Sequence, residues 1–150
     1  MRINGSTEVA RPVGEVFDFV ADERNEPLYN PWMARVDKLS PGPVGAGTRW
    51  VAVIHYLGRD TPMETTVVSY RRPRRLETRT RMSGAEIVGT VTFEERSTGT
   101  HLAWDWDVRL AGPQRLLAPL VAQAGNRREA ANWAALKQHL EQAGGSHDQR

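Results

Sequence analysis

The sequence predicts an α+β domain in which one antiparallel sheet of seven strands is covered by a long C-terminal helix. Between residues 34 and 110, segments rich in β-branched and aromatic residues alternate in polarity and are separated by turn residues. A short helical pattern precedes these segments, and a leucine- and alanine-rich stretch follows Gly112 and Pro113. Strands that follow one another without intervening helices are typical of an α+β fold.

Each element rests on a local signal, taken here in chain order. Residues 3–9 alternate weakly and predict a strand that ends before Pro12. Residues 13–21 carry apolar side chains at helical spacing, with Pro12 at a start position where its missing N–H does no harm. Residues 22–33 are polar and contain two prolines, so they predict a second short helix or a turn. The other strands are expected at 34–40, 47–57, 62–71, 75–83, 86–96 and 100–110, and the long helix from there to about residue 143.

The segment THLAWDWDVRL, residues 100–110, indicates which face of the sheet is buried. Successive side chains of a strand point to opposite faces, so Trp104 and Trp106 share one face while Asp105 and Asp107 share the other. We therefore expect the two indoles to point inward and the two aspartates to be surface charges. An outward-facing aspartate pair does not predict a catalytic dyad.

Turn chemistry predicts the register of the last strands. A two-residue turn at residues 83–84 sets Met82 opposite Ala85 and Thr78 opposite Gly89. A turn in the sequence STGT, residues 97–100, is expected to set Thr92 beside Asp105. The resulting inner face is consistently apolar, and a register error of one residue would have mixed the faces.

Two strands define their inner face less clearly. Residues 47–57 are apolar on both faces, and we favour Trp50, Ala52, Ile54 and Tyr56 as the inward set. In residues 62–71, two sets remain open: either Met63, Thr65, Val67 and Ser69 face inward, or Glu64, Thr66, Val68 and Tyr70 do.

The C-terminal helix carries two apolar stripes in different directions. Leu117, Leu120, Val121 and Ala124 form the first stripe, and Trp133, Leu136 and Leu140 form the second, roughly 140° away at 100° per residue. A straight helix does not lay both stripes on one surface. We expect a bend near Gly125, with the first stripe acting as a lid and the second packed on the sheet.

Composition narrows the classes of function. The 150 residues fit one domain, expected over 1–143 with a disordered tail at 144–150, and there is no cysteine for disulfides or thiolate metal sites. The net charge of +2 gives no long-range field for nucleic acid, and we interpret the arginines between residues 71 and 81 as a solvated face paired with Glu77 and Glu86. Without an apolar leader or span, we expect a cytoplasmic protein with no stable membrane insertion.

Several motifs in the sequence carry a resemblance to a known superfamily. They are RPVGEVFDFVADERNEPLYNPW, VDKLSPGPVGAGTRW, YRRPRRLETR and the closing WAALKQHLE. In this order, from about residue 4 to 142, the chain resembles the START-like SRPBCC superfamily, in particular its polyketide cyclase/dehydrase branch. The resemblance implies a helix-grip fold, a curved antiparallel sheet wrapped around the C-terminal helix with an internal cavity, and ligands that are lipids, sterols, polyketides or other hydrophobic molecules.

Combined with the face analysis, this resemblance predicts the walls of a ligand cavity. The expected lining residues are Trp50, Ile54, Tyr56, Thr78, Thr80, Val91, Phe93, Trp104, Trp106, Leu117, Leu120, Val121 and Ala124. For Trp104 and Trp106, ligand wall and ordinary core filling are equal alternatives. The aromatic segment around Tyr29 and Trp32 either gates the cavity mouth or plugs the end of the sheet.

Three functions are left open by the sequence. The first is binding of a small hydrophobic, aromatic, polyketide or lipid-like molecule, by a monomer or homodimer without cofactor or metal. The second is a polyketide cyclase or dehydratase that uses Tyr56 and Glu64, whose carboxyl pKa the cavity wall would raise. The third is a protein-interaction module with a filled interior.

Overall fold

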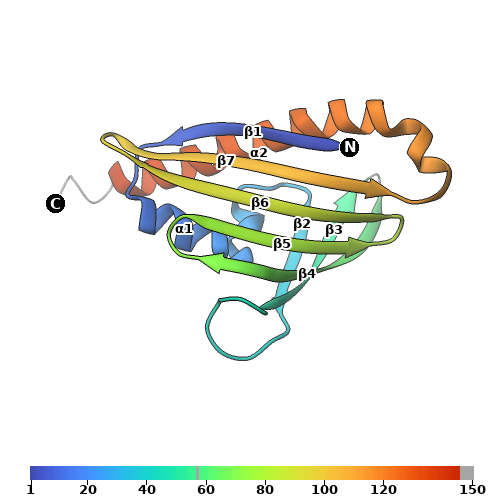
Figure 1. Cartoon of the computed structure of the whole chain (residues 1–150), viewed down its shortest axis with the longest axis horizontal. Coiled ribbons are helices and arrows are strands. Elements are labelled where there is room, and N and C mark those ends of the chain that lie inside the picture. The colour runs from blue at the N-terminus through green and yellow to red at the C-terminus, as the bar shows by residue number, and fades with distance from the viewer. Residues whose placement is uncertain (57, 146–150) are drawn as a thin grey trace.

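A computed structural model describes residues 1–56 and 58–145 and shows a single curved sheet with helices on one side (Figure 1). The elements in chain order are β1 (Arg2–Val9), α1 (Val13–Ala21), the 3-10 helix η1 (Glu23–Leu28), β2 (Met33–Lys38), β3 (Arg49–Tyr56), β4 (Arg59–Arg71), β5 (Arg75–Met82), β6 (Ala85–Arg96), β7 (Gly99–Leu110), η2 (Gly112–Leu117) and α2 (Ala118–Gly145). The predicted α+β architecture is thus confirmed. Residues 146–150 of the expected tail lie outside the described residues, and Gly144 and Gly145 belong to α2.

All seven strands form one antiparallel sheet in the order β1-β7-β6-β5-β4-β3-β2. Strands β2 to β7 are neighbours in the order in which they occur in the chain. The first strand, β1, pairs with the last, β7, and forms the edge of the sheet opposite β2. Sequential strands that pair as neighbours keep the connections short, which agrees with the two-residue turns at the β5–β6 and β6–β7 hairpins. β1 pairs with β7 along its whole length, from Arg2 opposite Asp107 to Val9 opposite Thr100. α2 packs against β1 at this edge of the sheet (Figure 1).

The register between β5 and β6 is as predicted, with Met82 opposite Ala85 and Thr78 opposite Gly89. The register between β6 and β7 is two residues away from the prediction, because Ser97 and Thr98 alone form the turn and Arg96 pairs with Gly99. Thr92 consequently faces Ala103 rather than Asp105. A shift of two residues leaves every side chain on its predicted face.

A β-bulge decides the inner face of β4. Thr65 and Val67 are buried, so the first half of the strand follows the first of the two alternatives. The pairing with β5 then skips Val68, which is exposed, and resumes with Ser69. One extra residue reverses the alternation, so Tyr70 points inward and its ring lies 5.1 Å from that of Phe17. Each alternative is therefore correct for one half of the strand.

Two glycines make room for the two indoles of β7. Gly5 of β1 is paired with Trp104, and Gly89 of β6 is paired with Trp106. A β-carbon at either glycine would overlap with the ring of its paired tryptophan. Because the glycines lie on opposite sides of β7, Trp104 covers β1 and Trp106 covers β6. The inner face thus presents a broad indole surface from only one strand.

The core fills one half of the space between sheet and helices. Phe17 of α1 contacts Phe93 with a ring separation of 4.9 Å, and Leu136 and Leu140 of α2 are buried in the same cluster. Along β7, Leu102 and Trp104 are buried, and the rings of Trp104 and Trp133 are stacked 5.2 Å apart. We call this half the closed half of the inner face.

The inner face is not closed over its whole length. Toward the β5–β6 turn and the end of β7, the inward side chains remain half-buried: Ile54, Met63, Thr80, Met82, Ile87 and Leu110. Solvent therefore reaches the sheet at this end, which we call the open half. α1 covers only the other end of the sheet (Figure 1).

The two apolar stripes of the C-terminal helix differ in burial. The second stripe, Trp133, Leu136 and Leu140, is buried against the sheet as predicted. Residues of the first stripe are exposed, and α2 is an uninterrupted α-helix from Ala118, so Pro119 lies in its first turn rather than inside it. Gly125 brings the middle of α2 against Ile3 of β1, and Asn126 accepts a hydrogen bond from the Asn4 N–H at 3.2 Å.

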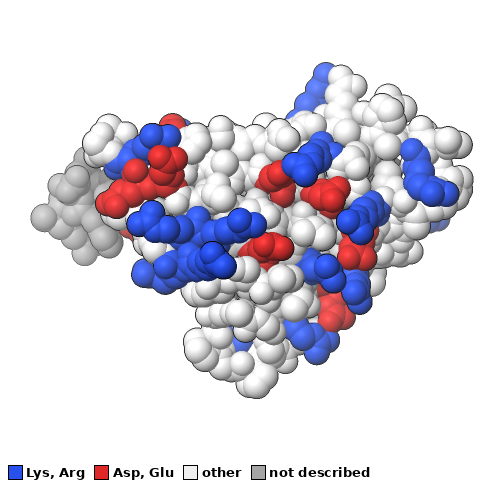
Figure 2. All heavy atoms as spheres, in the orientation of Figure 1, with Lys and Arg blue, Asp and Glu red and all other residues white. Residues whose placement is uncertain are grey.

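The outer face of the sheet is polar and its charges are paired. Arg75 bonds to Glu77 and Arg79 to Glu86, as the sequence indicated, and Arg72 forms two hydrogen bonds with Asp18 of α1. Figure 2 shows basic side chains gathered over the region of the β4–β5 turn with acidic side chains interspersed along the strands. Exposed pairs of this kind contribute little to the stability of the fold.

Candidate functional site

Three carboxylates from η1 and α2 lie near one another, beside the indoles of Trp106 and Trp133. Glu23 and Glu26 belong to η1, and Glu129 belongs to α2, one turn before the buried Trp133. All three are half-buried. Glu26 lies near both of the others: its charge raises the pKa of Glu23, and the charge of Glu129 raises the pKa of Glu26. We call these residues the inner carboxylate cluster.

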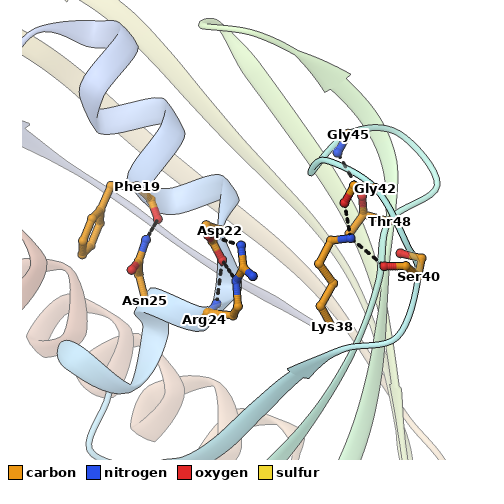
Figure 3. A network of polar contacts seen from close by, with 9 residues as sticks. All are labelled: Phe19, Asp22, Arg24, Asn25, Lys38, Ser40, Gly42, Gly45 and Thr48. Carbon is orange, nitrogen blue, oxygen red and sulfur yellow. Dashed lines mark hydrogen bonds and ion pairs between the residues drawn. The ribbon is translucent and has the colours of Figure 1, made fainter.

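Local hydrogen bonds fix η1 in place. Asp22 caps it by accepting from the Arg24 backbone N–H at 3.1 Å, and the Arg24 guanidinium donates to the same carboxylate at 2.8 Å. Asn25 donates its side-chain N–H to the carbonyl of Phe19 at 3.0 Å, which ties η1 back to α1 (Figure 3). Since consecutive turns of a 3-10 helix align residues i and i+3, Glu23 and Glu26 share one side.

The loop between β2 and β3 is fixed by a separate set of contacts. Lys38 donates to the carbonyl of Ser40 at 2.6 Å and to that of Gly42, and Thr48 accepts from the Gly45 N–H (Figure 3). The glycines of this loop are held by backbone contacts and lead into β3, not into a helix. This agrees with the sequence argument that they do not form a phosphate-binding loop.

Indole N–H groups hold Glu129. Trp133 donates to Glu129 Oε2 at 3.1 Å, and Trp106 also donates to this carboxylate. Trp106 comes from β7 and Trp133 from the same helix as Glu129, so the carboxylate links helix and sheet. A carboxylate that accepts from two indole N–H groups is oriented by the packing of the rings that carry them.

Burial changes the pKa of the cluster. Desolvation, partly opposed by the hydrogen bond from Asn30 at 2.9 Å, raises the pKa of Glu26 to about 7. Desolvation, with the neighbouring Glu26 and Asp22, also raises the pKa of Glu23, and desolvation raises that of Glu129. Near neutral pH, at least one carboxyl of the cluster is therefore able to carry a proton.

Tyr29 adds a phenol to the same region. Its ring lies 6.1 Å from Trp133 and 6.1 Å from Phe19. Desolvation, followed by the charges of Glu26, Glu23 and Glu129, raises the pKa of Tyr29 well above its ordinary value. The hydroxyl consequently remains protonated and available as a hydrogen-bond donor throughout the physiological pH range.

The structure divides the predicted cavity residues into three groups. Val91, Phe93 and Trp104 are buried in the closed half, and Trp50 is buried on β3. Ile54, Thr78, Thr80 and Trp106 are half-buried, and an exposed group on α2 and the turn before it comprises Leu117, Leu120, Val121 and Ala124. The half-buried group lies at or beside the inner carboxylate cluster and the open half. The side chain of Tyr56 lies outside the described part of the chain.

Two buried side-chain donors on the sheet have no protein partner among the described residues. These are the indole nitrogens of Trp50 and Trp104. The Arg24 guanidinium lies over the face of the Trp50 ring, 5.8 Å from its centre, and a guanidinium has only donors, so it offers the indole N–H no acceptor. An indole N–H that is buried without a partner costs free energy, which a bound molecule or a water can offset.

The pairing proposed from sequence between Tyr56 and Glu64 does not fit the fold. Glu64 lies on the outer face, 47% exposed, and bonds to Arg49 at 2.5 Å. The β4 bulge comes after Glu64, so the first half of the strand keeps the alternation that turns this side chain outward. Asp105 also faces outward, as expected, and pairs with Arg2.

Two surface hollows lie away from the predicted lining residues. One, of about 320 Å³, is formed by residues 10–13 and 95–99. The other, of about 270 Å³, lies on the outer face and is lined by Glu64, Thr66, Val68, Arg79 and Arg81. Within residues 1–56 and 58–145, no three His, Asp or Glu side chains converge as metal ligands, and no helix is long and apolar enough to cross a membrane.

Sequence reasoning missed the inner carboxylate cluster. Glu23, Glu26 and Tyr29 recur every three residues in ERNEPLY, the period of a 3-10 helix, and this was the available signal. Glu129 follows two arginines and reads as a solvated helix position. Only the packing of η1 opposite α2 brings these residues together.

A curved antiparallel sheet around a long C-terminal helix defines the helix-grip class. The chain belongs to the family described as polyketide cyclase / dehydrase and lipid transport, whose model matches residues 1–141. Fold and family are those of proteins that bind hydrophobic ligands. No match is found among curated proteins.

Solved structures share the fold over nearly the whole chain at low identity. A START superfamily protein from Mycobacterium smegmatis is 17% identical, with a TM-score of 0.80, and 95% of this chain covers 98% of that one. The protein TTHA0849 from Thermus thermophilus is also 17% identical, with a TM-score of 0.79 and coverages of 95% and 99%. Ara h 8.0201 is 12% identical, with a TM-score of 0.64 and coverages of 91% and 97%.

Proposed function

We propose that this protein binds a small hydrophobic molecule carrying a polar oxygen, on the inner face of its sheet at the open half. The observation that supports it best is the placement of the inner carboxylate cluster and Tyr29 beside the half-buried Trp106. An apolar or planar body would lie against Trp106, Ile54 and Ile87, and the oxygen would meet Glu26 or Tyr29. A wholly apolar surface would bind a ligand without fixing its orientation. A few polar groups that converge on the ligand fix that orientation.

The chemistry of the cluster favours a hydroxyl or carbonyl group in the ligand. Glu26, with a pKa of about 7, is able to donate a hydrogen bond when protonated and to accept one when ionised. Tyr29 donates at every physiological pH. A ligand carboxylate would meet the charges of Glu23 and Glu129, which disfavours fatty-acid-like anions and favours neutral polyketides or sterol-like alcohols.

Substitution at the open half tests this proposal. In Ile87→Trp the added ring should occupy the inner face beside Thr80, its partner on β5, and lower ligand affinity at least tenfold. Val68→Trp, on the exposed outer bulge, is the matched control and should bind as the unaltered protein does. Affinity is measured by calorimetry with a panel of neutral polyketides and sterols, and native mass spectrometry identifies any molecule that co-purifies from the host.

Two results would contradict it. One is the absence of both a co-purified molecule and any binding from the panel, which would favour a protein-interaction module. The other is equal affinity in the two tryptophan variants, which would place the ligand elsewhere.

A second candidate is acid–base catalysis at the same cluster, favoured by the pKa of Glu26. Its carboxylate would take a proton from the carbon beside a ligand carbonyl, and the Tyr29 hydroxyl would donate a hydrogen bond to the enolate oxygen that forms. Glu26→Gln should then abolish turnover of a polyketide substrate, by at least a hundredfold in kcat, while changing Kd less than threefold. Retained turnover in this variant would exclude the mechanism.

A further inference from the structure

We propose that η2 and the first turns of α2 dock on an anionic lipid bilayer surface. Four large apolar side chains stand out from this segment, which we call the leucine ridge: Leu116, Leu117, Leu120 and Val121, with exposed fractions of 85%, 53%, 66% and 38%. They are four of the seven large apolar residues that are exposed in the described part of the chain, and they are gathered within six positions. An exposed apolar group of this density marks a binding surface.

The fold keeps the leucine ridge away from the core. The hydrogen bond from the Ala111 N–H to the Gly84 carbonyl, 2.9 Å long, ties the start of the segment to the β5–β6 turn. Gly125 ties the middle of α2 to Ile3. Between these two attachments the segment projects at one end of the molecule, beyond the strands of the sheet (Figure 1). The ridge is therefore a surface feature held on both sides.

The charges around the leucine ridge fit an anionic surface. Residues 112–128 contain Arg115, Arg127 and Arg128 and no Asp or Glu, and of these Arg128 also lies close enough to Glu26 and Glu129 to lower their pKa values. In the view of Figure 2, the end of the molecule formed by η2 and the start of α2 shows basic and uncharged atoms without acidic ones. An apolar strip with arginines beside it is the pattern of a helix that lies in the interface of an anionic membrane.

A second copy of the chain is a poorer occupant. Symmetric pairing would set the leucine ridge of one chain against the same ridge of the other, and so bring the same arginines together without an acidic partner inside the segment. An anionic lipid surface supplies the missing negative charge and accepts the leucines into its acyl region. The contact is peripheral, since only the exposed side chains enter the interface.

The position of the leucine ridge links membrane docking to the proposed ligand site. It borders the β5–β6 turn, where the inner face is open, so a docked molecule would hold that opening close to the lipid surface. This consequence rests on the proposed ligand function, whereas membrane docking itself does not.

Vesicle flotation of the full chain tests the proposal. Vesicles of phosphatidylcholine alone are compared with vesicles of phosphatidylcholine and phosphatidylglycerol in roughly equal parts. We expect the protein to float with the anionic vesicles, to be released by high salt, and to bind zwitterionic vesicles at least tenfold more weakly. Leu116→Asp combined with Leu120→Asp should reduce binding to anionic vesicles at least tenfold.

A matched control separates the leucine ridge from apolar exposure in general. Leu39→Asp combined with Val68→Asp changes side chains that are 48% and 51% exposed on other elements, and it should bind as the unaltered protein does. Circular dichroism confirms that both variants fold, which their exposed positions favour.

Several outcomes would overturn membrane docking. Absence of flotation, equal loss in the two double variants, or indifference to anionic lipid would each do so. Self-association that the ridge variant abolishes would assign the surface to a second copy. A loss of ligand affinity without any vesicle binding would assign it to a lid that closes over the open half.

Discussion

Replacement of Trp133 by alanine is expected to lower the free energy of unfolding by about 3–5 kcal/mol, the largest stability effect of any single change proposed for this protein. Trp133 is 4% exposed, its ring is stacked on Trp104 at 5.2 Å, and it also faces Tyr29 and Trp106. Its removal leaves a cavity at the centre of the helix–sheet contact and takes one of the donors from Glu129. Urea titration measures the change.

Two further variants serve as controls for the Trp133→Ala prediction. Leu120→Ala removes an exposed side chain from the same helix and should change the free energy of unfolding by less than about 0.5 kcal/mol. Trp133→Phe keeps an aromatic ring but loses the N–H, and should cost about 1–2 kcal/mol. If Trp133→Ala cost less than about 1 kcal/mol, the stack would not be the main contact between α2 and the sheet.

Stability is expected to fall as pH rises from the ordinary carboxyl range to neutrality, because of Glu26. Its pKa is 4.5 in the unfolded chain and about 7 in the folded one. Between these values the folded state binds a proton that the unfolded state has lost, so the extra stability is fully present below the unfolded pKa and is lost as pH passes the folded one. The loss is about 2–3 kcal/mol after allowance for the solvent that reaches this half-buried group.

Glu26→Gln should remove the part of this pH dependence that Glu26 contributes, while Glu23 and Glu129, whose pKa values burial also raises, keep their own contributions. The amide resembles the protonated carboxyl, still accepts from Asn30, and carries no charge to desolvate. Denaturant titrations at about pH 5 and about pH 8 should therefore show a variant similar to the unaltered protein at the lower pH and more stable at the higher one.

Glu64→Gln serves as the control for the pH experiment. This carboxylate is paired with Arg49 on the outer face, so its change should leave the difference between the two pH values in place. An identical pH dependence in the unaltered protein and in Glu26→Gln would show that Glu26 is not held in a desolvating environment.

The fold and most of its faces could be predicted because they depend on local periodicity. The two-residue turn at Ser83–Gly84 fixes the β5–β6 register, and the alternation around Trp104 and Trp106 sorts inner from outer side chains over three strands. The second stripe of α2 was also assigned correctly to the sheet. Each of these features is determined by residues a few positions apart, which the chain displays directly.

Features that depend on a single inserted residue were harder to predict from the sequence. The bulge at Val68 switches the face of β4 within one strand, and no turn signal marks it. The prediction offered two alternatives for the whole strand, and the strand uses both. Glu64 lies before the bulge, in the half of the strand where the first alternative holds, so it faces outward and is not available as the catalytic carboxylate that the sequence suggested.

By itself, the sequence determined an antiparallel sheet with one apolar face, two indoles on that face and a long helix to cover it, because side-chain period and turn chemistry are local properties. Only the tertiary structure decided which part of the inner face is covered and which charges meet there. Glu26 and Glu129 are about a hundred residues apart, and their proximity follows from how η1 and α2 pack over the same sheet. Such proximity arises from the summed packing of many distant residues, which no local pattern encodes.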